Sequence, residues 1–309
     1  MFAFIVRRLL QFIPTILGIS LIMFLLLNLI PGNAALSSAG RLELAPEVVE
    51  QIKAELGLDK PIVQRYVQYI TRLAQGDMGQ SYLRRYDVSE VVFSRLGATL
   101  KLAFAAISIA LLIGVPLGFF AALKQGTWMD MLLTVVAVGG VSIPQFWLGI
   151  LLMYFFGFML HLLPTSGYGN GSLANLVLPA LTLGLGYTAM LARITRAAVI
   201  EVLTSDYVRT ARAKGLSELA INVRHVFRNA FVLILTTAGL LFGSLIGQTV
   251  VVERLFSWPG IGSLVVEAIF QRDIPVAQGC LLVIIFVFLT VNLLVDILYR
   301  AINPQIDFE

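Results

Sequence analysis

Long apolar runs alternate with short polar segments along almost the whole chain. A transmembrane helix needs about 20 predominantly apolar residues, and six stretches come near or exceed that length. They are Leu9–Ile30, Thr99–Leu123, Leu132–Leu160, Leu173–Leu191, Ala230–Val252 and Gly279–Ala301. The pattern therefore predicts an all-α, polytopic membrane protein with six transmembrane helices.

Prolines mark where two of these runs end or bend. The first run stops at Pro31 and Gly32, and the third contains Pro144 in "GGVSIPQF", where the missing N–H predicts a kink. Arg7 and Arg8 precede the first run, as they would in a signal peptide. The run is too long for a signal sequence, and only a weak cleavage site follows it, so an uncleaved first span is predicted.

Lys and Arg side chains are concentrated in alternate loops, which sets the orientation. The segments predicted to be cytoplasmic carry Arg7, Arg8, Lys124, Arg193, Arg196, Arg209, Arg212, Lys214, Arg224, Arg228 and Arg300. Both termini are therefore predicted to be cytoplasmic. The predicted organisation is an N-terminal transmembrane helix at 1–30, an extracytoplasmic helical segment at 31–98, a transmembrane core at 99–301 with a cytoplasmic coupling loop at 193–229, and a cytoplasmic tail at 302–309.

The extracytoplasmic segment has the pattern of two short amphipathic helices. One is predicted from Pro46 to Gly57, and the other from Pro61 to Gly76, with Tyr66, Ile70 and Leu73 on one face. A flexible linker is the alternative, and it fits this periodicity poorly. We expect the helices to pack on the outer face of the spans.

Composition agrees with a membrane protein and limits its chemistry. The chain of 309 residues is 58% hydrophobic and 13% charged, against about half and a quarter in soluble domains. One cysteine and two histidines exclude a disulfide framework and leave little for a metal site. The phosphate loop, zinc-protease and hydrolase-elbow motifs do not occur in the sequence, so no catalytic, metal-binding or cofactor-binding residue is predicted. The net charge of +4 requires no nucleic-acid partner.

Asp296 is the one charge well inside a predicted span. It shares a helix face with Asn292 and Arg300, so a local pair with Arg300 or packing against another helix is the simplest interpretation, and a proton relay is a minor one. A secondary transporter would require paired intramembrane charges and inverted repeats. An intramembrane enzyme would require a nucleophile with its base. The sequence offers neither set of features.

Two further patterns concern packing and docking. Gly239, Gly243 and Gly247 form one stripe of the fifth span, which predicts close helix packing. The polar stretch from Asp206 to Asn229 is predicted to form two short helices that bend at Gly215. Their features are caps at Thr204 or Ser205 and at Ser217, a basic cluster of Arg209, Arg212 and Lys214, and an apolar stripe of Leu219, Val223, Val226 and Phe227. A surface loop or an anionic-lipid patch would not need such caps.

The stretch "EVLTSDYVRTARAKGLSELAINVRHVFRNA" resembles the coupling region of permease subunits in ATP-binding-cassette importers of the dipeptide, oligopeptide and nickel group. Other blocks resemble the same family: "VRRLLQFIPTILGISLIMF", "LGLDKPIVQRYVQYI", "GDMGQSY", "SIPQFWLGILL", "LPTSGYG", "ERLFSWPGIG", "RDIPVAQG" and "NLLVDILYRAINPQI". The sequence departs from the usual pattern at Leu233, "PGNA" and "NPQI".

The resemblance implies a type I importer fold in a bacterial or archaeal cell membrane. Two permease subunits, often different, would form the path, two ATPases would bind ATP and Mg, and an external solute-binding protein would deliver the cargo. Membrane lipid surrounds such a subunit. The family's coupling motif corresponds to Arg209, Thr210, Ala211 and Gly215, so the implied ATPase-docking residues are Asp206, Tyr207, Arg209, Thr210, Ala211, Arg212, Lys214, Gly215 and Leu216. Peptide is the commonest cargo in this group, while nickel, glutathione and sugars are carried by relatives.

Overall fold

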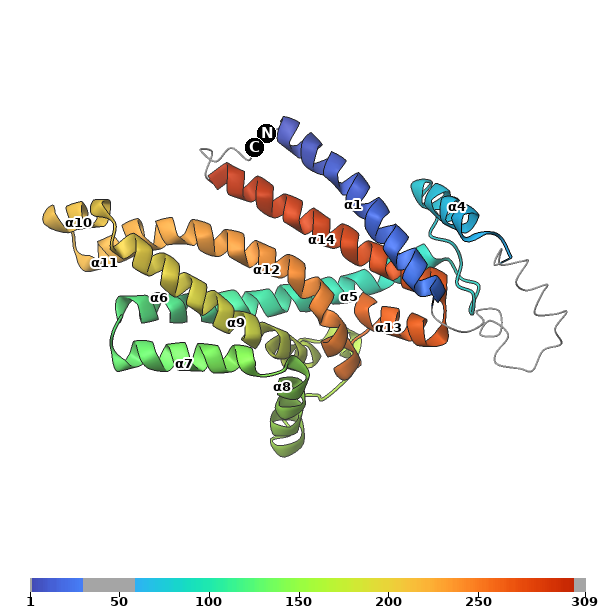
Figure 1. Cartoon of the computed structure of the whole chain (residues 1–309). Coiled ribbons are helices and arrows are strands. Elements are labelled where there is room, and N and C mark those ends of the chain that lie inside the picture. The colour runs from blue at the N-terminus through green and yellow to red at the C-terminus, as the bar shows by residue number, and fades with distance from the viewer. Residues whose placement is uncertain (1, 30–58, 303–309) are drawn as a thin grey trace. The chain divides into compact units, whose positions relative to one another are not determined.

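The computed structural model describes residues 2–29 and 59–302, which fold almost entirely into helices (Figure 1). The helices are α1 (Phe2–Leu29), α4 (Ile62–Ala74), α5 (Val88–Ile109), η1 (Ala110–Gly114), α6 (Val115–Leu123), α7 (Trp128–Ser142), α8 (Gln145–Leu152), η2 (Met153–Met159), η3 (Gly169–Gly171), α9 (Leu173–Leu203), α10 (Asp206–Ala213), α11 (Glu218–Ala220), η4 (Ile221–Phe227), α12 (Arg228–Leu255), α13 (Ile261–Gln271) and α14 (Ile274–Ile302). In these residues β pairing is limited to an isolated bridge between Gln80 and Asp87. The all-α prediction is confirmed.

Five helices in the described part of the chain are long and apolar enough to cross a membrane. They are Phe4–Leu27, Val88–Leu123, Leu173–Leu203, Glu218–Leu255 and Ile274–Arg300. Each of them overlaps one of the predicted runs. The prediction of six single spans is not confirmed, because the third predicted run is not one helix. The side of the membrane on which the termini lie stays a prediction.

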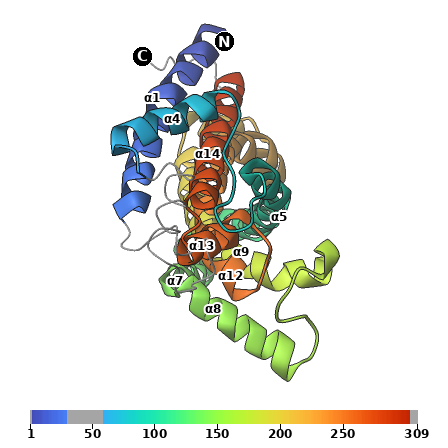
Figure 2. The same cartoon turned by 90° about the vertical axis from the view of Figure 1, so that its right-hand side faces the viewer.

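The third run breaks at the predicted proline. α7 ends at Ser142 and α8 begins at Gln145, with Ile143 extended (φ −80°, ψ 123°) between them. Pro144 has no N–H to donate, and its ring disfavours helical backbone at the preceding residue, so the helix stops there. α8 and η2 then run in a different direction from α7 (Figures 1 and 2), while α8 keeps contact with α9.

Several spans are longer than hydropathy predicted. α5 begins at Val88 instead of Thr99, and α9 ends at Leu203 instead of Leu191. The fifth span starts at Glu218, well before Ala230, and passes through a π-helical turn, η4. Charged residues end an apolar run without ending a helix, because a helix continues wherever its backbone hydrogen bonds remain satisfied.

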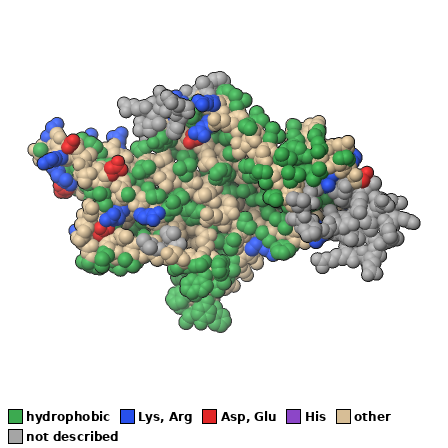
Figure 3. All heavy atoms as spheres, viewed as in Figure 1, with side chains coloured by type: hydrophobic (Ala, Val, Ile, Leu, Met, Phe, Trp, Pro, Cys, Tyr) green, Lys and Arg blue, Asp and Glu red, His purple; other side chains and the backbone are tan. Residues whose placement is uncertain are grey.

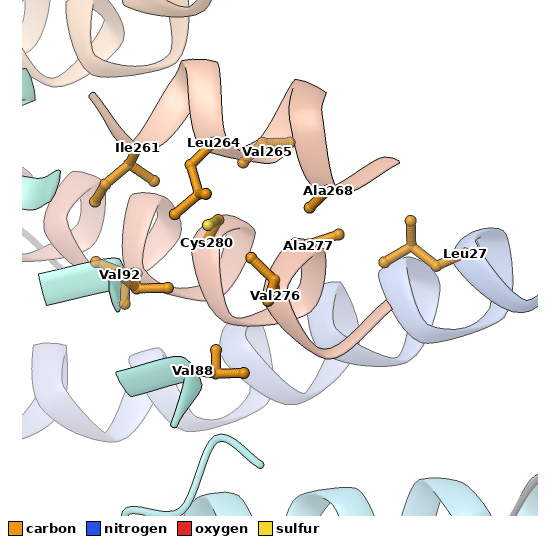
Figure 4. Close-up of a cluster of buried hydrophobic side chains, with 11 residues drawn as sticks. Leu27, Val88, Val92, Ile261, Leu264, Val265, Ala268, Val276, Ala277 and Cys280 are labelled. Atoms are coloured by element: carbon orange, nitrogen blue, oxygen red, sulfur yellow. The ribbon is translucent and has the colours of Figure 1, made fainter. Parts of the chain in front are cut away.

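The chain forms two compact units, and the first contains the described residues up to Thr99 together with 259–289. Its core is an aliphatic cluster contributed by α1, α5, α13 and α14 (Figure 4). The buried members are Leu27, Val88, Val92, Ile261, Leu264, Val265, Ala268, Val276, Ala277, Cys280 and Val283. At the start of α13, the Ile261 N–H donates to Thr99 Oγ1 at 2.8 Å. Apolar burial and this hydrogen bond together fix α13 against α5.

In the same unit, α4 packs on α1 through aromatic side chains. The ring centroid of Phe24 lies 5.4 Å from that of Tyr66 and 6.0 Å from that of Tyr69. Tyr66 also donates from its hydroxyl to the Leu17 carbonyl at 3.1 Å. Burial, with a smaller contribution from Tyr66, raises the pKa of Tyr69 to about 12.

The amphipathic helix predicted between Pro61 and Gly76 is confirmed as α4. Its half-buried face carries the predicted Tyr66, Ile70 and Leu73. The helix predicted between Pro46 and Gly57 lies outside the described residues.

A buried carboxylate holds the loop between α4 and α5. Asp273, which is 3% exposed just before α14, accepts from the Ser81 hydroxyl and from the Tyr82 N–H, the latter at 3.0 Å. Ser81 Oγ in turn accepts from the Arg84 N–H at 3.0 Å. A negative charge at a helix N-terminus is favourable. The loop is therefore fastened to the α13–α14 junction by polar contacts.

The second unit contains residues 100–258 and, from residue 290, the described end of α14. α9 is its central helix and contacts α6, α7, α8 and α12. Two glycines, one at the end of η1 and one in α6, allow close approach to α9: a Cβ on Gly114 would lie 2.6 Å from the Thr188 carbonyl oxygen, and one on Gly118 would lie 2.2 Å from that of Ala192. Small residues at this spacing allow close helix packing in a bilayer.

Candidate functional site: the helical turn between α9 and α12

α10 follows α9 after a two-residue break. Ser205 occupies its N-cap position with extended backbone (φ −71°, ψ 150°). Its hydroxyl donates to the Val202 carbonyl at 2.6 Å, and that of Thr204 donates to the Glu201 carbonyl at 2.9 Å. The predicted side-chain cap is therefore wrong, because both hydroxyls bind the orphan carbonyls that end α9.

The far end of α10 has the predicted glycine geometry. Gly215 has φ +78°. Its N–H donates to the Arg212 carbonyl at 2.9 Å, and the Leu216 N–H donates to the Ala211 carbonyl at 3.4 Å. These two bonds form a Schellman motif, which needs a left-handed residue where Gly215 stands. The bend predicted there is confirmed.

One face of α10 is buried in the second unit. Val208 is fully buried and Ala211 is 6% exposed. They belong to an apolar cluster that joins α6, α9, α10, η4 and α12. Its other buried members are Val115, Ala122, Ala198, Val199, Ile221, Val226, Ala230 and Ile234. α10 is therefore seated on the transmembrane helices by hydrophobic contact.

The opposite face is open to solvent and carries charge. Its exposed members are Asp206, Tyr207, Arg209, Thr210, Arg212, Lys214, Gly215 and Leu216. Lys and Arg side chains gather over α10 and α11, whereas hydrophobic side chains cover α8 (Figure 3). All the candidate docking residues except Ala211 are exposed. Ala211 is buried against the transmembrane helices instead, and its place among the docking residues stays a prediction.

Two polar contacts connect α10 to the chain that follows. Across the bend, the Arg212 guanidinium donates from Nε to Glu218 Oε1 at 2.8 Å, and this hydrogen bond raises the pKa of Arg212. Asn229 Nδ2, in α12, donates to the Tyr207 hydroxyl at 2.9 Å. The Arg212 pair is exposed, so it contributes little to stability by itself. The pair connects the two sides of the bend and so restricts its angle.

The segment after the bend differs from its prediction. Ser217 caps it as expected, accepting from the Ala220 N–H at 3.4 Å. Val226 is buried and Phe227 is half-buried, but Leu219 and Val223 are exposed, and Ile221 is buried instead. The predicted stripe assumed 3.6 residues per turn. In the π-helical η4 hydrogen bonds span five residues, which places Ile221 and Val226 on one face.

A partly buried ion pair that the sequence pattern did not reveal joins α9 to α7. The Arg196 guanidinium donates to both carboxylate oxygens of Asp130, with distances of 2.6 and 2.7 Å, and the Gly126 N–H donates to Asp130 at 3.1 Å. Asp130 is 6% exposed. The pair joins the start of α7 to the last turns of α9 just before α10. The partners stand 66 positions apart in the sequence, so helical spacing gave no signal.

The glycines predicted to pack closely have three different environments. A Cβ on Gly239 would lie 2.3 Å from Val295 Cγ2, Gly243 is buried, and Gly247 faces open space. A close approach to a neighbouring helix backbone is found instead at Gly118, where a Cβ would lie 2.2 Å from the Ala192 carbonyl oxygen of α9. The G-x-x-x-G spacing of Gly114 and Gly118 in "GVPLG" could have indicated it.

Two family models match almost the whole chain. Residues 114–308 match the binding-protein-dependent transport system inner membrane component, and residues 1–103 match the N-terminal part of the membrane component of such systems. The chain belongs to this family.

Curated relatives of this permease match it over its full length. It is 42% identical over 315 residues to a putative peptide transport system permease protein of Brucella suis biovar 1 (strain 1330), with 100% of both chains covered. It is 41% identical over 309 residues to a glutathione transport system permease protein of Escherichia coli (strain K12), again with 100% of both chains covered.

Solved structures share the fold. A methionine ABC transporter in inward-facing conformations aligns with a TM-score of 0.58 and 16% identity, covering 69% of this chain and 96% of the other. An amino acid ABC transporter aligns with a TM-score of 0.53 and 18% identity, covering 69% and 94%. At such identities the likeness concerns the fold, and it confirms the predicted type I importer architecture.

Family membership establishes the class of activity. The chain is a non-catalytic, multi-pass permease subunit of a binding-protein-dependent ABC importer in the inner membrane, and ATP hydrolysis belongs to separate subunits. It therefore works with ATPase subunits and an external solute-binding protein. The secondary transporter and the intramembrane enzyme are excluded by this assignment.

Proposed function

We propose that α10 is the coupling helix of this permease and that its exposed face docks on a cytoplasmic ATPase subunit. The observation that carries the proposal is the division of α10 into two faces. Val208 and Ala211 are buried against the transmembrane helices, while Tyr207, Arg209 and Thr210 are exposed on the other side. A helix that is bound to the membrane helices along one face can transmit a push received on the other.

The connections of α10 support transmission as a rigid body. α9 leads into it within two residues, and the segment after Gly215 continues without a break into α12. The Schellman motif, the Arg212–Glu218 pair and the Tyr207–Asn229 hydrogen bond restrict movement at both ends. A displacement of α10 would then move the end of α9 and the beginning of α12 together. Rigid-body shifts of packed helices of this kind are common in proteins that switch between two conformations.

Gly215 offers the sharpest test of coupling. A Cβ there would meet nothing within 4 Å, so a substitution strains only the backbone. We expect Gly215→Val to lower transport and transport-stimulated ATP hydrolysis in the reconstituted complex, because β-branched residues disfavour positive φ. Gly215→Asn is the matched control, since Asn tolerates this conformation, and it should retain most activity. Equal activity of the two variants would contradict a coupling role for the bend.

We further propose that the cargo is a peptide or a glutathione-sized solute. The support is that full-length relatives carry the names of peptide and glutathione permeases. With two histidines and one cysteine in the chain, a dedicated nickel path is not favoured. Binding of labelled dipeptides, oligopeptides and glutathione to the solute-binding protein of this importer would identify the class. A binding protein selective for sugars would contradict it.

We also propose a complex of this chain with a second, different permease and two ATPases, with residues 31–98 outside the cytoplasm. The sequence resemblance supports this stoichiometry. Co-expression with candidate sister permeases followed by mass measurement tests it, and a complex containing two copies of this chain would contradict it. For topology, a cysteine placed at the exposed Val67 of α4 should react with a membrane-impermeant maleimide from outside intact cells.

A further inference from the structure

The second unit contains an apolar cavity between α6, α7, α8 and α9. Its volume is about 320 Å³. The wall includes Leu117 from α6, Leu133 and Ala137 from α7, Leu148 from α8, and Leu185 and Ala189 from α9. A cavity of this size and lining is suited to a hydrocarbon chain.

The polar groups of the wall are almost all occupied within the protein. Thr134 Oγ1 donates to the Asp130 carbonyl, and Thr188 Oγ1 donates to the Gly184 carbonyl, each at 2.8 Å. Arg196 is bound to the Asp130 carboxylate. A polar cargo such as a peptide would find few partners here, and burying its unpaired amides would be costly.

Arg193 is the exception. Its side chain lines the cavity, is exposed, and makes no hydrogen bond or ion pair with the described residues. It therefore presents a free guanidinium at one end of an apolar wall. Guanidinium groups bind phosphate oxygens in bidentate geometry.

The position of the cavity along α9 matches one leaflet of a bilayer. From Leu185 to Arg196 the lining residues fall on one face of the helix, and at 1.5 Å per residue they extend over about 17 Å. The hydrocarbon core is about 30 Å thick, so this face covers roughly half of it. Arg193 lies toward the end that continues into α10, which is predicted to be cytoplasmic.

We propose that this cavity binds an anionic phospholipid of the cytoplasmic leaflet. One acyl chain lies along the wall formed by α6, α7 and α9, and the phosphate is held by the guanidinium of Arg193. The apolar lining supplies the affinity for the chain. The unpaired charge of Arg193 supplies the preference for an anionic head group over a zwitterionic one.

The test uses the assembled importer in nanodiscs that contain a small fraction of phosphatidylglycerol with a photoreactive group in its acyl chain. After irradiation, mass spectrometry identifies the labelled peptides. We expect labelling of the α6, α7 and α9 segments that line the cavity, and competition by unlabelled phosphatidylglycerol but not by phosphatidylcholine.

Two pairs of variants give matched controls. A Cβ on Gly140, which lines the cavity, would meet only Ala189 Cβ at 3.5 Å, whereas one on the adjacent Gly139 would meet nothing within 4 Å. Gly140→Leu should fill the cavity and abolish labelling, and Gly139→Leu should not. Arg193→Ala should weaken labelling by about five-fold, as expected for one basic residue at an anionic surface, while Arg224→Ala, an exposed Arg outside the cavity, should not.

Three outcomes would overturn the proposal. The first is labelling spread evenly over exposed helices such as α8, which means only annular lipid. The second is labelling that Gly140→Leu and Arg193→Ala leave unchanged. The third is a cross-link from the sister permease to a cysteine placed at Ala137, which would make the cavity a subunit interface. If phosphatidylcholine with the same photoreactive acyl chain labels the cavity as strongly as phosphatidylglycerol does, the role of Arg193 is overturned.

Discussion

Replacing Gly118 with alanine tests whether α6 and α9 approach as closely as the structure indicates. The added Cβ would lie 2.2 Å from the Ala192 carbonyl oxygen and 2.8 Å from Thr195 Cβ. Carbon–oxygen contacts between helices normally lie near 3.3–3.6 Å, so the two helices would have to separate by roughly 1 Å. Neither contact can be relieved by rotating a flexible side chain, because both involve the backbone or a Cβ.

We therefore expect Gly118→Ala to destabilise the permease by about 1–3 kcal/mol, the usual cost of overpacking. The measurement is reversible unfolding of the purified complex in mixed micelles, followed by transport in proteoliposomes. Transport should fall together with stability, because α9 leads directly into α10.

Gly186→Ala is the control, since a Cβ at Gly186 in α9 would meet nothing within 4 Å. In an open helical position, replacing glycine with alanine stabilises by about 0.5–1 kcal/mol. The two variants should thus change stability in opposite directions. If Gly118→Ala proves as stable as Gly186→Ala, the close packing of α6 on α9 is refuted.

Three other variants test polar contacts. Asp130→Asn should lower the free energy of unfolding by about 1.5–3 kcal/mol, because it weakens the charged hydrogen bonds with Arg196. A double-mutant cycle with Arg196→Gln that shows no coupling energy would contradict the pair. Tyr207→Phe removes the hydrogen bond with Asn229, so it should lower the free energy of unfolding by about 0.5–1.5 kcal/mol. It should also reduce the stimulation of ATP hydrolysis in the assembled importer, while hydrolysis by the isolated ATPase subunits stays the same. Asp273→Ala leaves buried donors at Ser81 and in the loop without partners, so limited proteolysis should cut residues 75–87 faster, and an unchanged cleavage rate would argue against the fastening.

Features governed by local chemistry were predictable from the sequence. The missing N–H of Pro144 determined where the third run breaks. Gly215 was identified because a helix C-terminus there needs positive φ, and the amphipathic pattern of α4 placed Tyr66 on its inner face. In each case the information lies within a few residues, so neighbouring sequence suffices.

Helix ends were less predictable, because hydropathy reports contact with lipid and not backbone hydrogen bonding. The apolar run that gave α9 stops before Arg193, yet the helix continues to Leu203. The π-helical turn η4 likewise changed which residues are buried, bringing in Ile221 and leaving Val223 exposed. A period of 3.6 cannot anticipate a turn whose hydrogen bonds span five residues.

The sequence by itself determined that this chain crosses a membrane several times, that it carries no phosphate-loop motif of its own, and that a charged helix ending at Gly215 interrupts its apolar runs. Only the tertiary structure decided which side chains meet. Asp130 pairs with Arg196, Gly118 packs against Ala192, and Arg193 lies beside an apolar cavity without a partner among the described residues. Hydropathy, helix caps and turn chemistry act between near neighbours in the chain. The partner of a residue on one transmembrane helix depends on how the helices are placed in space, which no local pattern specifies.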